Sequence, residues 1–224
     1  MKNLLAILFF SVLMLFSCSR EDSSTVDQDR IFTEYELFYN ANEDKTFARA
    51  TFKFSNITGT KLELSQPSEV RFNGDVLTFN PVFAYYEKEY AGLLENGTFE
   101  WNDTNGEIYK NTIEIHPINY PDTIDIIKRS QSFELEWEGD ALQLLELVTV
   151  TINGENEFDA QIFTTNDVNS QSIILSKAKL EKIGTGPGTL FMDRSYLPLI
   201  QESTSAGGIL LGRYRPVNKE VVLE

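Results

Sequence analysis

The sequence predicts an all-β protein built from antiparallel β-sandwiches. The first sign is period-two alternation of apolar and polar residues, as in Tyr35, Leu37 and Tyr39, which alternate with Glu34 and Glu36, a pattern typical of half-buried strands. The second is the Asn-Gly dipeptide after alternating segments, at Asn73-Gly74 and Asn153-Gly154, which favours hairpin turns because both positions accept positive φ. The third is spacing, since strand signals recur about every eight to twelve residues with turn formers between them.

The strands follow one another in order along both halves of the chain. The alternation and β-branched runs predict strands near residues 35–39, 48–54, 70–77, 98–101, 113–115, 133–137, 148–152, 172–175, 189–192, 208–214 and 220–223. Helical signal is scarce, although residues 85–94 and 140–147 each allow a short helix. Prolines and turn formers concentrate in residues 117–125, so a domain boundary is expected there. We therefore predict two sandwich domains, 31–124 and 125–224, that resemble immunoglobulin-like domains; one larger sandwich is the alternative.

The N-terminus has the pattern of an export signal. Lys2 precedes an apolar run from Leu4 to Phe16, and Cys18 follows at the point where the chain turns polar. Such a run is too short to span a bilayer. The junction resembles the lipobox of bacterial lipoproteins, which implies that residues 1–17 are removed and Cys18 is lipidated. A plain secretory signal followed by a structural cysteine is the alternative.

Residues 18–30 are predicted to be the lipidated cysteine and a flexible tether. They contain many charges and little apolar surface. Arg20-Glu21-Asp22 resembles the surface-export signal of Bacteroidota lipoproteins, although a solvated linker explains it equally well. Ser19 is not the aspartate that retains some lipoproteins in the inner membrane. The resemblance implies a lipid anchor in the outer membrane, with the protein on the cell surface.

Composition excludes some partners. The chain has 34 acidic and 19 basic residues and a formal net charge of −15. This charge argues against nucleic acid and anionic lipid headgroups as partners. Because Cys18 is the only cysteine, stability must come from apolar cores rather than disulfides. No cofactor is indicated.

Catalytic residues are few. His116 is the only histidine, and it precedes Pro117, as a strand-end residue at a turn would. Glu134, Glu136 and Glu138 alternate with apolar residues and resemble the catalytic strand of one family of sandwich-fold glycoside hydrolases. That resemblance implies Glu134 as nucleophile and Glu138 as acid. A solvated outer strand face explains the same alternation, and we expect no enzyme.

Other motifs are weaker. Asn102, Asp103, Asn105 and Glu107 could supply oxygens to calcium, but a hydrated turn is favoured and no metal is expected. Residues 184–188 are glycine-rich without a phosphate-loop lysine, so a flexible connection is favoured. The aromatic stretch with Tyr85, Tyr86 and Tyr90 is expected to be core rather than a ligand platform.

The predicted function is interaction with a partner. Asp122-Thr123-Ile124 resembles the O-glycosylation site of Bacteroidota, which marks Thr123 as a possible acceptor. We expect a lipid-anchored, non-enzymatic binding or envelope-assembly module with an unidentified protein or glycan ligand. The loops 40–45 and 102–107 are the expected contact sites, while glycan binding or cleavage by the Glu134 strand is the alternative.

Overall fold

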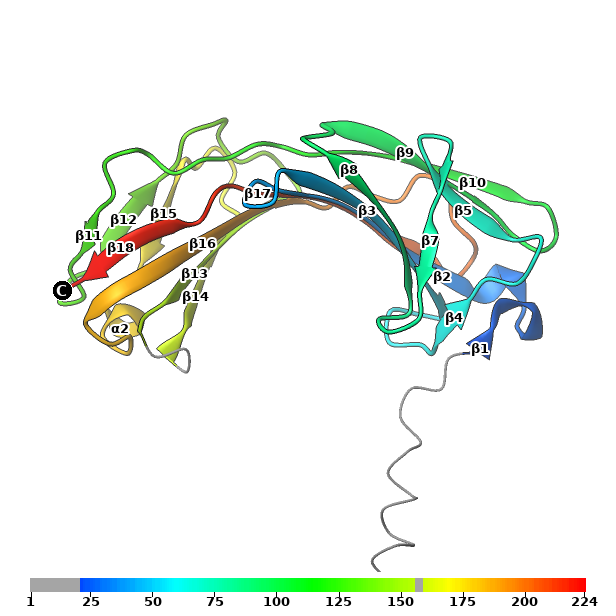
Figure 1. The fold of residues 1–224 in the computed structure, drawn as a ribbon, viewed down its shortest axis with the longest axis horizontal. Coiled ribbons are helices and arrows are strands. Elements are labelled where there is room, and N and C mark those ends of the chain that lie inside the picture. The colour runs from blue at the N-terminus through cyan, green and yellow to red at the C-terminus, as the bar shows by residue number, and fades with distance from the viewer. Residues whose placement is uncertain (1–20, 156–158) are drawn as a thin grey trace, which may run out of the picture.

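The computed structural model describes residues 21–155 and 159–224, and this part of the chain is almost entirely β. Figure 1 shows an arch with one half at each end and long strands running between them. The first half contains β1 (Glu21–Asp22), β2 (Ile31–Asn40), β3 (Lys45–Phe54), β4 (Lys61–Glu63), β5 (Glu69–Phe72), β6 (Asp75–Val76), β7 (Thr78–Asn80), β8 (Tyr85–Ala91), β9 (Asn96–Asn102) and β10 (Ile108–Glu114). Then follow β11 (Ile126–Ile127), β12 (Phe133–Glu136), β13 (Glu146–Asn153), β14 (Gln161–Thr165), β15 (Ser172–Leu175), helix α2 (Lys177–Leu180), β16 (Gly186–Tyr196), β17 (Gly208–Arg215) and β18 (Lys219–Leu223).

A 12-stranded sheet connects both ends of the arch. Its main path runs β1-β4-β3-β2-β17-β16-β13-β14, with β7 and β8 joined to β3 and with β11 and β18 joined to β16. Most neighbours are antiparallel, while β1–β4, β2–β17 and β11–β18 are parallel. The predicted all-β, antiparallel fold class is confirmed.

A smaller sheet covers each half of the large one. In the first half, β10-β9-β5-β6 packs on β2 and β3, with Tyr35 stacked on Phe99 at 4.9 Å and Phe52 beside Trp101 at 5.1 Å between ring centroids. In the second half, β12 and β15 pair with each other and contribute Leu135 to the same apolar cluster as the inward side chains of β13. Each half is therefore a two-layer sandwich, because the facing sides of its two sheets are largely apolar and buried.

The C-terminal strands tie the two halves together. β17 lies parallel to β2, from Gly208 opposite Thr33 to Arg215 opposite Asn40, and β18 then pairs with β16 in the second half. The segment before β17 also packs on the first half, since Thr204 Oγ1 donates to the Ile31 carbonyl at 2.8 Å. The first sandwich therefore includes β17, a strand from the end of the chain. The two sandwiches do not correspond to the consecutive ranges 31–124 and 125–224.

The flexible tether predicted for residues 18–30 is wrong for residues 21–30. β1 pairs with β4, and two 3-10 turns follow at Ser23–Thr25 and Gln28–Arg30. Gln28 is buried and donates to the Ser23 carbonyl at 2.7 Å. Asp22 and Asp27 cap the turns with their side chains, so these polar residues are ordered by local hydrogen bonds rather than by apolar burial. The signal peptide and Cys18 lie outside the described residues.

Neither short helix allowed by the sequence is present. Residues 85–91 form β8, which pairs with β3 and brings Glu87 to the Arg49 guanidinium. Residues 140–145 form a loop and turn before β13 begins at Glu146. Cross-strand pairing decided residues 85–91 against their local propensity, while residues 140–145 serve as the connection into β13. Within residues 21–155 and 159–224, no helix is long and apolar enough to cross a membrane.

Candidate functional site

A cavity of about 530 Å³ lies where the two halves of the arch meet. Four separate segments line it: the end of β2 with the loop after it, the crossover from the first half to the second, the residue stretch after β12, and the link from β17 to β18. Its lining comprises Tyr39, Ala41, Asp44, Asn119, Tyr120, Pro121, Asp122, Glu138, Tyr214, Pro216, Val217, Asn218 and Lys219. We call it the junction cavity.

Three tyrosines supply its aromatic surface. Tyr39 and Tyr214 are opposite each other in the β2–β17 ladder, and their ring centroids are 5.2 Å apart. Burial raises the pKa of Tyr39 to about 12, helped by its hydrogen bond to the Asp44 carboxylate and by that carboxylate's charge. Burial also raises the pKa of Tyr214 and of Tyr120. All three hydroxyls therefore keep their protons at neutral pH.

The rim of the junction cavity is polar and mostly acidic. Asp44, Asp122 and Glu138 contribute carboxylates, and Lys219 contributes one ammonium group, which donates to the Asp122 carbonyl at 3.3 Å. An excess of carboxylates over cations disfavours anionic ligands.

Side-chain to backbone hydrogen bonds fix the loop after β2 at this rim. Asn42 donates from Nδ2 to the Pro216 carbonyl at 3.2 Å and accepts from the Asn218 amide at 2.9 Å. Asp44 adopts a positive φ of 50°. This loop therefore places the Asp44 carboxylate at the rim of the junction cavity, next to the Tyr39 hydroxyl.

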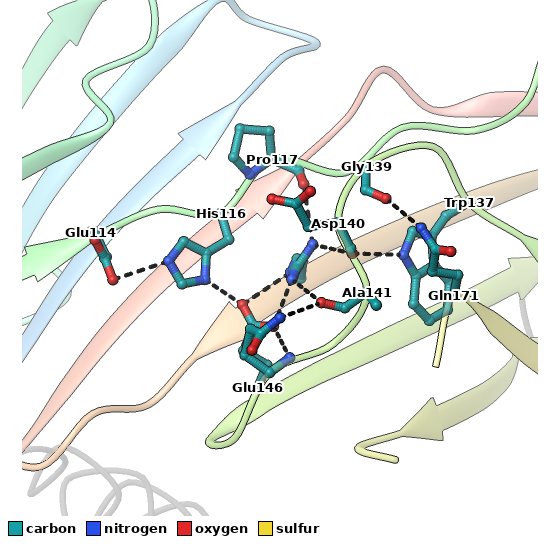
Figure 2. A network of polar contacts seen from close by, with 11 residues as sticks. Glu114, His116, Pro117, Trp137, Gly139, Asp140, Ala141, Glu146 and Gln171 are labelled. Atoms are coloured by element: carbon teal, nitrogen blue, oxygen red, sulfur yellow. Dashed lines mark hydrogen bonds and ion pairs between the residues drawn. The ribbon is translucent and has the colours of Figure 1, made fainter. Parts of the chain in front are cut away.

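His116 lies at the partly exposed side of a polar network beside this junction (Figure 2). Its Nδ1 contacts Glu146 and its Nε2 contacts Glu114 at 3.1 Å, while its ring stacks on Tyr196 at 4.8 Å. Glu146 also accepts from Arg194, at 2.6 Å to Nη2 and 3.1 Å to Nε. The predicted strand-end position of His116, just after β10, fits its place at the start of the crossover.

The Glu146–Arg194 pair is a structural ion pair. Their side chains are 0% and 2% exposed, and Arg194 also donates to the carbonyls of Pro117, Asp140 and Ala141. Burial alone would raise the pKa of Glu146, but hydrogen bonds from Arg194, the Gln143 amide and His116, together with the charge of Arg194, lower it. The pair fastens the crossover and the loop before β13 onto β13 and β16.

Sequence reasoning missed Glu146 and Arg194. The signal was present, because each is a charged residue at an inward position of an otherwise apolar strand face, as in Glu146, Val148 and Val150. A charge in such a position needs a partner of opposite charge. The sequence does not show which partner it is.

A second, smaller cavity of about 370 Å³ lies next to this network. It is lined by Asn96, Thr112, Ile113, Glu114, Tyr196, Pro198 and Gln201. Gln201 donates to the Thr112 carbonyl at 2.8 Å and accepts from the Thr112 amide at 2.6 Å. Its polar lining is therefore largely engaged in holding the segment before β17 to β10.

The alternating glutamates are not gathered in one site. Glu134 and Glu136 are exposed on β12, and Glu134 accepts from Ser172 Oγ at 2.7 Å. Glu138 lies beyond the strand and lines the junction cavity, which Glu134 does not. The structure therefore gives no shared cavity to the nucleophile and acid that the hydrolase resemblance implied.

The loop at residues 102–107 is a hydrogen-bonded turn. Asp103 is buried, and its Oδ1 accepts from the amides of Asn105 at 2.8 Å and Glu107 at 2.9 Å. Among the described residues, no group of three or more histidine, cysteine, aspartate or glutamate side chains could hold a metal ion. Of the two loops expected to carry contacts, residues 40–45 contribute to the junction cavity and residues 102–107 line neither cavity.

The remaining candidates fall in several places. Thr123 is exposed in the crossover. In the aromatic stretch, Tyr86 is buried and Phe79 and Tyr90 pack against the core, as predicted, whereas Phe83 is exposed. Of the glycine-rich residues 184–188, the last three are the first residues of β16. Cys18 lies outside the described residues.

Comparisons with known proteins identify no family. No family model matches the chain, and no curated protein matches it. Among solved structures, the FN1–FN3 domains of chicken CNTN1 are 11% identical with a TM-score of 0.28, over 80% of this chain and 61% of that one. A bacterial ice-binding adhesin is 13% identical with a TM-score of 0.24, over 87% of this chain and 65% of that one.

The tandem V-type regions of the chitin-binding protein VCBP3 are 8% identical with a TM-score of 0.24, over 87% of this chain and 99% of that one. The chain spans less than two thirds of the length of the first two structures. A likeness of this size assigns the chain to no family and no function.

Proposed function

We propose that this protein is a lipid-anchored, non-enzymatic binding module of the outer membrane, exposed on the cell surface, with the junction cavity as its ligand site. The observation that carries the proposal is the cavity itself, about 530 Å³ in volume and lined by protonated tyrosines and by the carboxylates of Asp44, Asp122 and Glu138. This size and lining suit one or two sugar units of a neutral glycan. The partner is thus a glycan rather than a nucleic acid or an anionic surface.

The anchoring part of the proposal rests on the N-terminal sequence. Cys18 follows the apolar run of the export signal, and Arg20-Glu21-Asp22 resembles a surface-export signal. The first strand begins at Glu21, so only Ser19 and Arg20 separate it from Cys18. A connection of this length reaches about 10 Å. The folded arch would therefore lie directly on the outer leaflet rather than on a long tether.

Glycan cleavage by the β12 glutamates is the weaker candidate. Only Glu138 reaches the junction cavity, and retaining hydrolysis needs two carboxyl groups about 5–5.5 Å apart across one sugar. Binding without turnover needs no such pair. We therefore place Glu138 among the ligand-contacting residues and assign it no catalytic role.

The test is binding of neutral oligosaccharides to the detergent-solubilised, lipidated chain on a glycan array, followed by calorimetry with the best binder. Asp44→Asn should weaken binding about tenfold, because a carboxylate is a stronger hydrogen-bond acceptor than a carboxamide. Asparagine tolerates the positive φ of this position, so the fold should be unchanged.

Glu134→Gln is the matched control, since Glu134 is exposed and lies outside the cavity. It should leave the Kd unchanged. Absence of any glycan binding, or equal binding by wild type and Asp44→Asn, would refute the proposed site. Release of shortened glycans that is lost in Glu134→Gln would instead support the hydrolase.

A further inference from the structure

Three large apolar side chains are exposed on two neighbouring loops of the first half. Ile57 lies in the β3–β4 loop and is 50% exposed, while Val82 and Phe83 lie in the β7–β8 loop and are 81% and 59% exposed. We call this group the apolar foot. Single exposed apolar residues are ordinary, but a group of them at one end of a molecule indicates a contact surface.

Hydrogen bonds hold both loops against the same pair of strands. Lys61 on β4 donates from Nζ to the Phe83 carbonyl at 2.6 Å, and Lys53 on β3 donates to the Ile57 carbonyl at 2.8 Å. The two lysines are opposite each other in the β3–β4 ladder. The loops are therefore adjacent.

The β7–β8 loop is also ordered from within. Asn80 accepts from the amides of Val82 and Phe83 through its side-chain oxygen, at 3.1 and 3.3 Å. The ring of Phe83 stacks on Tyr85 with centroids 5.7 Å apart. A turn fixed by hydrogen bonds therefore exposes Val82 and Phe83 to solvent, where they add little to the apolar core.

The apolar foot lies at the end of the molecule where the described chain begins. β1 pairs with β4, with Glu21 opposite Leu62, so it is next to the strand that holds Phe83. Figure 1 shows β1, β4 and the turn after β7 together at one end of the arch. Two residues separate Glu21 from Cys18. If Cys18 carries lipid, this end of the arch is within about 10 Å of the leaflet.

We propose that the apolar foot inserts into the lipid leaflet that holds the Cys18 anchor. This inference rests on the proposed lipid anchoring. Ile57, Val82 and Phe83 would enter the boundary between headgroups and acyl chains, and Tyr85 would lie at the headgroup level, where amphipathic rings are favoured. The contact is apolar rather than electrostatic, because Glu21 and Glu63 flank Lys61 in β1 and β4.

Insertion would fix the orientation of the arch on the membrane. A lipid on a single flexible connection leaves a protein free to rotate, whereas a second contact point at the same end restricts that rotation. The apolar foot would hold the first half down and keep the arch in one orientation relative to the surface.

The test uses tryptophan as a depth reporter in the lipidated mature chain. Phe83→Trp is the probe, and Ile174→Trp on β15 of the second half is the matched control, since Ile174 is 55% exposed. The native Trp101 and Trp137 are buried in the two sandwiches and give a constant background. Both variants are reconstituted into zwitterionic phosphatidylcholine vesicles whose acyl chains are brominated, a quencher of tryptophan fluorescence at contact.

We expect brominated lipid to quench about half of the added fluorescence in Phe83→Trp and none in Ile174→Trp. Val82→Trp provides a second probe in the same loop and should behave like Phe83→Trp. Equal, negligible quenching of all three in chains that float with the vesicles would overturn the apolar foot and leave the anchor intact. An N-terminal peptide without the mass of the lipid, in chains that do not float, would overturn both.

Discussion

At the scale of single residues, Glu146 and Arg194 show how a charged pair is accommodated between two apolar layers. Both occupy inward strand positions and are nearly inaccessible to water. The cost of burying them is offset only because each is satisfied: Arg194 binds three carbonyls besides the carboxylate, and Glu146 accepts from the Gln143 amide at 2.6 Å. Removing one partner leaves the other buried and unpaired, which destabilises the fold more than replacing both partners with apolar residues would.

Glu146→Gln should therefore destabilise the fold by about 3–5 kcal/mol at pH 7. Because the folded-state pKa of Glu146 is lowered, its ionised form stabilises the protein above the unfolded-state value of about 4.3, and this stabilisation is lost as pH falls through the folded-state pKa. The difference in the free energy of unfolding between wild type and variant should thus become smaller below about pH 4. Urea unfolding of both proteins from pH 7 to pH 3 measures this difference.

The exposed Glu134 provides the control for that series. Glu134→Gln should change stability by less than about 0.5 kcal/mol at every pH. A constant difference between wild type and Glu146→Gln down to pH 3 would show that Glu146 does not stabilise the protein through its charge.

At the scale of elements, β17 lies in close contact with β10 at Gly212. A Cβ at this position would lie 2.0 Å from the Glu114 carbonyl oxygen, and at Gly208 it would lie 2.6 Å from the Thr33 carbonyl oxygen. These are backbone atoms that cannot move aside as a flexible side chain can. Glycine is required here because a strand of the large sheet and a strand of the covering sheet pass in contact.

Gly212→Ala should therefore destabilise the protein by at least about 1–3 kcal/mol, the usual cost of forcing one extra methyl group into a packed site. Gly184→Ala is the matched control. Its Cβ would meet nothing closer than 3.9 Å, so it should be neutral or slightly stabilising through the unfolded state. Thermal unfolding of the two variants measures the contrast, and equal Tm values would mean that β10 and β17 are less closely packed than described.

Among the elements, the sequence predicted those features that depend on residues close together in the chain, such as the buried face of a strand or a tight turn. The alternation in β2 identified its buried face correctly, and Asn73-Gly74 makes the expected tight turn, with φ of 49° and 87°. Asn153-Gly154 does not, because β13 simply ends there and β14 begins only at Gln161. Asn-Gly forms a tight turn at the first position and none at the second, because β14 begins too far after Asn153 for a two-residue turn to connect it to β13.

At the scale of the whole molecule, the important pairing is not local. Tyr39 and Tyr214 become neighbours only because β17 returns from the end of the chain to lie beside β2. Arg213 strengthens that contact from the other face, where it binds Glu36 at 2.7 Å and covers the Phe38 ring at 3.9 Å. No alternation or turn signal encodes such a parallel pairing, which is why the junction cavity was not predictable although one of its loops, residues 40–45, was singled out.

This pairing makes the first half dependent on the C-terminal segment. A fragment of residues 21–124 would keep its covering sheet but lose β17. One edge of β2 would then have no hydrogen-bond partners, and the apolar inward side chains of β2 would lose the neighbours that β17 provides. We expect this fragment to show no cooperative thermal transition, whereas residues 21–224 unfold in one step. Circular dichroism with temperature measures both.

Mixing the fragment with a separate chain of residues 125–224 provides the complementary experiment. Because β17 pairs with β2 through backbone groups and the Thr204 hydroxyl donates to the Ile31 carbonyl, the two pieces should associate and regain a cooperative transition. A fragment of residues 21–124 that folds alone, with a sharp transition of its own, would contradict this dependence. It would mean that the apolar contacts between β2, β3 and the covering sheet are enough to stabilise one sandwich without a strand from the other end of the chain.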